Sequence, residues 1–118
     1  MPIHSPDRLL ESLSDLETAL AANERRADAM RTRIAHIREQ RVAGRRYSEI
    51  VSAEARPLIV EMLTQSIREL ESAGVDVRRH EAESLRREGM TMDAIADLFG
   101  VSRQRVSALL RTGKEPGG

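Results

Sequence analysis

An unbroken heptad repeat of apolar residues constrains the first third of this chain more than any other feature. The repeat runs through residues 7–41 in alternating steps of four and three, a pattern typical of a coiled coil rather than of an ordinary amphipathic helix. Ser5-Pro6 is a suitable start signal, and the polar Asn23 can fix register or oligomeric state. We therefore expect residues 1–46 to form a coiled-coil oligomerisation helix with these residues at the dimer contact: Leu9, Leu13, Leu16, Leu20, Asn23, Ala27, Met30, Ile34 and Ile37.

Charges beside the repeat favour an antiparallel arrangement of two such helices. An antiparallel homodimer would place Glu17 near Arg38 and Glu24 near Arg31, with one arginine repulsion on the other flank, whereas a parallel homodimer would set arginines against each other on both flanks. Exposed pairs contribute only about 0.2–1 kcal/mol each, so the preference is small. The helix could instead pack against later helices of the same chain, and these alternatives stay open.

Residues 47–74 are expected to supply central helices for packing or for a second dimer surface. Gly44 marks a break after the long helix, a short helix is expected over about 48–56, and Pro57 opens a stronger helix that ends at Ala73-Gly74. That helix is apolar on more than one face, so it needs partners on two sides. Its apolar residues are Leu58, Ile59, Val60, Met62, Leu63, Ile67 and Leu70.

Residues 92–111 have the pattern of a helix-turn-helix. Ala96 falls where the two helices touch, Gly100 falls at the turn, and Ser102 can cap the second helix. The sequence predicts an all-α fold that ends in a three-helix unit over residues 75–112 and a flexible tail over 113–118. The apolar contacts of the unit are assigned to Ile95, Phe99, Val101, Val106 and Leu109.

The outward side of the second helix carries groups that can hydrogen-bond DNA. Arginine can reach guanine or phosphate, glutamine can pair with adenine, and a small apolar side chain can touch a thymine methyl group. We expect base contacts from Arg103, Gln104, Ser107 and Ala108, and phosphate contacts from Ser102, Arg105, Arg111 and Lys114.

The segment 89–111 resembles the helix-turn-helix of bacterial transcription proteins. It is most similar to the promoter-reading C-terminal region of primary sigma factors and to the DNA-binding domain of resolvase and invertase recombinases. In the sigma factors, the arginine that matches Arg103 contacts DNA, while a glutamate matching Gln104 and an arginine matching Ser107 read bases. The resemblance implies a DNA contact at Arg103 and, because the other two positions differ, a different target sequence.

Composition excludes several other classes of protein. The chain of 118 residues has no cysteine, so a disulfide framework or a cysteine-based zinc site is impossible, and its three histidines are far apart in sequence. It contains no apolar run of membrane-spanning length and no signal peptide, so a soluble, cytoplasmic protein associated with the nucleoid is expected. No paired carboxylates, nucleophile–base set or glycine-rich phosphate loop indicates an enzyme, and no metal or other cofactor is expected.

The sequence therefore favours a homodimeric, bacterial, DNA-binding transcriptional regulator or nucleoid-associated protein. Its recognition helix, residues 102–111, would enter the major groove of double-stranded DNA. The net charge of zero supports one alternative, in which the protein is an interaction factor that docks on RNA polymerase or a sigma factor through the coiled coil. Salt-dependent retention on DNA would separate the two.

Overall fold

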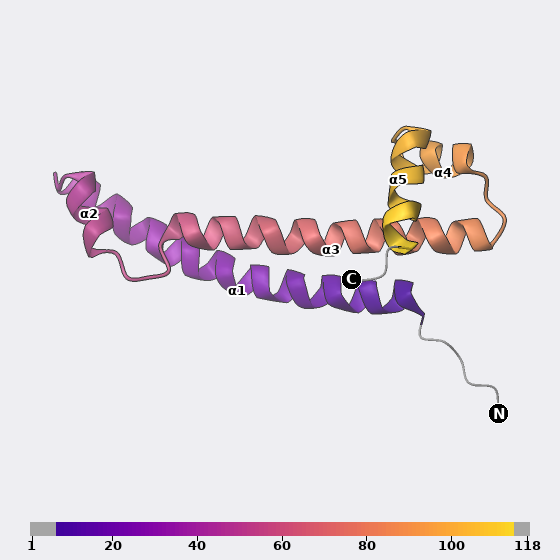
Figure 1. The fold of residues 1–118 in the computed structure, drawn as a ribbon. Helices are drawn as coiled ribbons and strands as arrows, with labels where there is room; N and C mark the ends of the chain where they lie inside the picture. Colours follow the sequence, from indigo (N-terminus) through magenta and orange to yellow (C-terminus); the bar gives the residue numbers. More distant parts are fainter. Residues whose placement is uncertain (1–6, 115–118) are drawn as a thin grey trace, which may run out of the picture. The chain divides into compact units, whose positions relative to one another are not determined.

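The computed structural model describes residues 7–114, and within that range the chain forms five α-helices and no strand (Figure 1). This confirms the predicted all-α fold with a long N-terminal helix. The long helix is followed by a short one, by a second long one and by two short C-terminal helices. Their bounds are α1 (Arg8–Val42), α2 (Tyr47–Ala53), α3 (Ile59–Arg87), α4 (Met92–Phe99) and α5 (Arg103–Lys114).

The predicted helix end at Ala73-Gly74 is wrong, because α3 runs through it as one helix of 29 residues. The predicted domain boundary between residues 74 and 75 therefore falls inside a helix. A glycine in a helix interior costs about 1 kcal/mol but leaves the hydrogen-bond ladder intact. Gly89, whose φ of 100° lies outside the helical range, stands just past the real end of α3. At the other end of the chain, α5 runs to Lys114, so residues 113 and 114 are helical and not part of a flexible tail as predicted; residues 115–118 lie outside the described range.

The chain divides into two compact units, and α1 and α3 contribute to both. We call residues 17–71 the hairpin unit, because α1 and α3 pair there. The remaining described residues, 7–16 and 72–114, form the head unit. None of the helices within residues 7–114 is long and apolar enough to cross a membrane.

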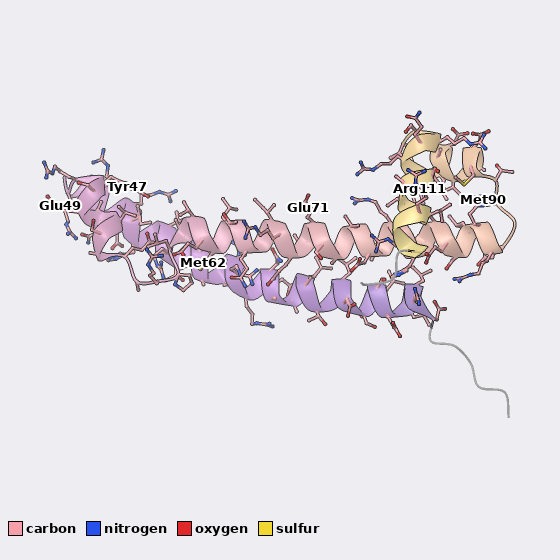
Figure 2. The ribbon with its side chains drawn as sticks, viewed as in Figure 1. Tyr47, Glu49, Met62, Glu71, Met90 and Arg111 are labelled. Carbon is pink, nitrogen blue, oxygen red and sulfur yellow. The ribbon has the colours of Figure 1, made fainter. Side chains whose placement is uncertain are left out.

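In the hairpin unit, the contact between α1 and α3 is partly polar. The guanidinium group of Arg26 donates to the hydroxyl oxygen of the buried Ser66 at 3.0 Å and to the carboxylate of Glu69 at 3.2 Å. Figure 2 shows Met62, which is buried, directed toward α1, and Glu71, which is exposed, directed away from it. These contacts align α1 with α3 in one register.

A second arginine of α1 holds the connection between α2 and α3. Arg33 forms an ion pair of 2.7 Å with the buried carboxylate of Glu54 and also donates to the carbonyl oxygens of Ala55 and Pro57. The same carboxylate of Glu54 accepts the backbone N–H of Ile59 at 2.8 Å, which satisfies one free donor at the start of α3. Removing one partner from a buried pair of this kind typically costs about 3–5 kcal/mol.

The heptad repeat of α1 does not form one continuous seam. Its positions alternate between half-buried and more exposed, and the amide of Asn23 donates to the carbonyl oxygen of Ala19 in its own helix rather than across an interface. In both units α1 packs against α3 of the same chain, as in the alternative left open above. Part of the predicted nine-residue contact is therefore already covered within one chain. The half-buried row is Leu9, Leu16, Asn23, Met30 and Ile37, whereas Leu13, Leu20 and Ile34 are exposed and Ala27 is half-buried between them.

The head unit begins with a cap and a polar contact. The carboxylate of Asp7 accepts the backbone N–H groups of Leu9 and Leu10, so Asp7 caps the start of α1. The predicted start signal at Ser5-Pro6 lies outside the described residues. Ser12, which is buried, hydrogen-bonds Nδ1 of His80 on α3. This pair connects the start of α1 to the part of α3 on which α4 and α5 pack.

Candidate nucleic-acid interface

The turn between α4 and α5 is built by local hydrogen bonds. Thr91 caps α4, because its hydroxyl oxygen accepts the backbone N–H of Ala94 at 3.1 Å. Gly100 ends α4 in the left-handed conformation, at φ 68° and ψ 35°. Two residues later, the hydroxyl oxygen of Ser102 accepts the backbone N–H of Arg105 at 3.1 Å and caps α5. The turn of three residues is therefore fixed at both ends by the residues that the sequence assigned to it.

A small apolar core fastens this pair of helices to α3. Ile95 of α4 and Val106 of α5 are fully buried beside Ala82 of α3, and Ala96 is buried where α4 meets the core. Burying a side chain of this size contributes about 1.5–3 kcal/mol. Val101 departs from its expected core role, since 38% of its surface remains exposed. Leu109 is buried as expected, and Phe99 is partly buried against the core.

The outward face of α5 gathers several of the predicted contact residues. A helix advances about 100° per residue, so Gln104, Ala108 and Arg111 project roughly opposite the buried Val106. Gln104 and Arg111 are exposed, whereas Ala108 and the neighbouring Ser107 are half-buried. The side chain of Lys114 lies outside the described side chains. Four of the predicted contacts therefore share one side of a short helix, where a groove of DNA could reach them.

The guanidinium groups of two predicted contact residues, Arg103 and Arg111, have partners within the head unit. Arg103 lies 3.7 Å from the carboxylate of Asp93 on α4, and both side chains are more than two-thirds exposed. The guanidinium group of Arg111 donates to the hydroxyl oxygen of Ser107 at 2.9 Å, one turn back on α5 (Arg111 is labelled in Figure 2). Exposed ion pairs contribute about 0–1 kcal/mol, so the pair with Asp93 can open at little cost when an anion approaches.

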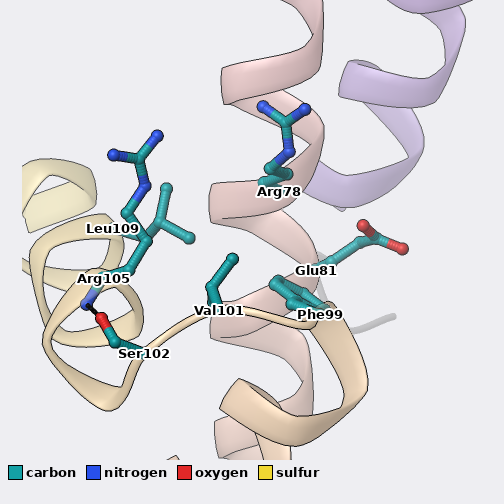
Figure 3. Close-up of a pocket in the computed structure, with 7 residues that line it drawn as sticks. All are labelled: Arg78, Glu81, Phe99, Val101, Ser102, Arg105 and Leu109. Atoms are coloured by element: carbon teal, nitrogen blue, oxygen red, sulfur yellow. Dashed lines mark hydrogen bonds between the residues drawn. The ribbon is translucent and has the colours of Figure 1, made fainter.

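Arg105 projects away from the outward face and lines an open cavity of 710 Å³ (Figure 3). Arg78 and Glu81 of α3 form the opposite wall, and Ser102 lies on the turn side. The structure thereby brings Arg78, which the sequence did not assign to the interface, to the same cavity as two predicted phosphate contacts. No spacing in the sequence signals this proximity, because it depends on how α5 packs on α3.

The interface is chemically a set of hydrogen-bond donors on a helix without acids. The sequence of α5 carries arginines at 103, 105 and 111 and no aspartate or glutamate. Within the described part of the chain, no group of three or more histidine, aspartate or glutamate side chains is arranged to hold a metal ion. Such a surface can bind an anion or the polar edges of bases.

Comparison with known proteins adds no relative from which a role could be transferred. No family model matches the chain, and no curated protein or solved structure matches it.

Proposed function

We propose that this protein is a DNA-binding regulator or nucleoid-associated protein that acts as a homodimer and inserts α5 into the major groove. The observation that carries this proposal is the exposed face of α5, where Gln104, Arg111 and the neighbouring Arg103 project from a helix held by a capped turn. Such a helix, fixed on a small core and bearing amide and guanidinium donors, is the arrangement with which helix-turn-helix proteins read base edges.

Two kinds of contact are assigned on this proposal. Base contacts come from Arg103, Gln104, Ser107 and Ala108, and phosphate contacts come from Ser102, Arg105, Arg111 and Lys114. Arg103 leaves its weak pair with Asp93 when DNA is bound, and Arg78 adds a further positive charge beside Arg105. Because the net charge of the chain is zero, affinity depends on this local concentration of donors rather than on a general attraction to phosphate.

The test is retention on double-stranded DNA as a function of salt concentration. Arg103→Ala and Gln104→Ala are each expected to weaken binding to a selected duplex by about 5- to 150-fold, since a base contact is worth about 1–3 kcal/mol. Arg68→Ala is the matched control, because Arg68 is exposed on α3 in the hairpin unit. If the unaltered protein is not retained on DNA even at low salt, the proposal is wrong, and docking on RNA polymerase or a sigma factor becomes the better reading.

A further inference from the structure

The hairpin unit exposes large apolar side chains that its own helices do not cover. Leu20 and Ile34 of α1 are 46% and 40% exposed, and Val60, Leu63 and Ile67 of α3 are 59%, 51% and 55% exposed. We call these five residues, together with Ala27, the apolar face. Scattered apolar side chains are normal on a protein surface, whereas several large ones gathered on one side of a pair of helices indicate a contact with another molecule.

Helix geometry places both rows of the apolar face on one side of the hairpin. Arg26 and Ser66 touch each other, so they mark where α1 and α3 face each other. A helix turns about 100° around its axis per residue, so Leu20, Ala27 and Ile34 lie about 80–120° around α1 from Arg26. The row on α3 lies about 60–120° around that helix from Ser66, in the same direction of rotation. Because the two helices are antiparallel, equal rotations bring both rows to the same side of the pair.

The row on α1 is self-complementary when a second copy runs in the opposite direction. Leu20 and Ile34 are equally spaced on either side of Ala27, so an antiparallel copy centred there would place each leucine beside an isoleucine. Ile67 is level with Ala27, because the neighbouring Arg26 contacts both Ser66 and Glu69. One twofold axis at this level can therefore pass through the middle of the row on α1 and through Ile67, at one end of the row on α3.

The charges beside this row obey the same symmetry. Glu17, Glu24, Arg31 and Arg38 are all exposed and lie one step further around α1. About an axis near Ala27, Glu17 meets Arg38 of a second copy and Glu24 meets Arg31, so the pairs on both sides of the axis carry opposite charges. A surface whose apolar row and charged row are both self-complementary about one point is suited to an isologous contact.

We propose that the apolar face is the surface on which a second copy of this chain docks, antiparallel, to form a four-helix arrangement with its axis near Ala27 and Ile67. This inference deepens the proposed function, since it rests on a homodimer and names the surface that forms it. The contact differs from the predicted nine-residue seam, because only the exposed row of the heptad repeat takes part and α3 supplies the other half.

The first test introduces a charge on the proposed twofold axis. Ile67→Glu would bring two carboxylates together across the axis, so sedimentation equilibrium without DNA is expected to give a monomer, while the unaltered protein sediments at twice the chain mass. Ser72→Glu, on the far side of α3 and exposed, is expected to remain a dimer. A monomeric unaltered protein, or a dimeric Ile67→Glu variant of normal helix content, overturns the proposal.

The second test uses the absence of cysteine from the chain. In the Ala27→Cys variant, oxidation is expected to give a covalent dimer. Helices packed about 8–10 Å apart bring the two copies of residue 27, which face each other at the twofold axis, within the Cα–Cα distance of roughly 4.4–6.8 Å that a disulfide spans. Ala29→Cys places the thiol on the opposite side of α1 and is expected to stay uncrosslinked. Equal crosslinking of the two variants contradicts the proposed face.

The third test concerns orientation. Glu24→Arg sets two arginines against each other and is expected to weaken dimerisation several-fold, whereas combining it with Arg31→Glu restores opposite charges and the affinity. A double variant no better than the single one excludes the antiparallel arrangement. None of these measurements uses DNA. A stable dimer without DNA affinity would refute the proposed DNA binding and leave this inference standing. A monomer that binds DNA would refute this inference and the homodimer, but leave the proposed DNA binding in place.

Discussion

At the scale of single residues, Gly100 and Gly74 show that one residue type has opposite roles in this fold. Gly100 adopts φ 68°, where an added Cβ costs roughly 1–2 kcal/mol whatever the available space. Gly74 lies within α3, where the nearest atom to an added Cβ would be the guanidinium nitrogen of Arg78 at 3.6 Å, an ordinary contact. The backbone conformation, rather than the space around the residue, decides whether a glycine is needed.

The same substitution should therefore change stability in opposite directions at these two positions. Gly100→Ala is expected to lower the free energy of unfolding by about 1–2 kcal/mol. Gly74→Ala is expected to raise it by about 0.5–1 kcal/mol, because alanine loses less backbone entropy in a helix. Urea denaturation followed by circular dichroism measures both, and a loss of stability in both variants would contradict the assignment of Gly74 to a helix interior without strain.

At the scale of elements, the cap of α5 joins stability to the proposed DNA contact. The hydroxyl oxygen of Ser102 accepts the backbone N–H of Arg105. Ser102→Ala is expected to lower the free energy of unfolding by about 1 kcal/mol, because the cap is lost. Ser102→Asp keeps the cap and adds a negative charge, which is stabilising at the N-terminus of a helix. The aspartate would nevertheless repel phosphate, so thermal denaturation should show a normal midpoint for this variant and a binding assay should show weakened DNA affinity. Equal DNA affinity of the aspartate variant and the unaltered protein would remove Ser102 from the interface.

How far the sequence predicts an element depends on whether its cause is local. The caps at Thr91 and Ser102 and the turn at Gly100 were predictable, because they depend on residues within four positions. The long helix was predictable from its repeat. Which of its sides is buried was not predictable, because this depends on where α3 packs against it. Arg26 and Arg33, which flank the repeat in sequence, are held by Ser66, Glu69 and Glu54, and this pairing becomes visible only in the folded chain. The nearness of Arg78 to Arg105 was hidden for the same reason.

At the scale of the whole molecule, the two proposals together predict how binding to DNA depends on salt. Each phosphate contact contributes a slope of about −0.9 to the plot of log binding constant against log salt concentration. A dimer that engages DNA with both head units makes twice the phosphate contacts of a single chain. The slope for the dimer on long duplex DNA of mixed sequence should therefore be about twice that of the Ile67→Glu variant.

This comparison isolates the role of the second copy, because Ile67 lies in the hairpin unit and the substitution leaves every proposed DNA contact of the head unit in place. The affinity of the variant should also fall, since the second head no longer binds at the high effective concentration that the first one creates. Ser72→Glu adds the same charge without altering the apolar face and should retain the steep slope. Identical slopes for the Ile67→Glu variant and the unaltered protein would mean that one head unit binds DNA alone. Dimerisation through the apolar face would then serve a purpose other than strengthening the binding to DNA.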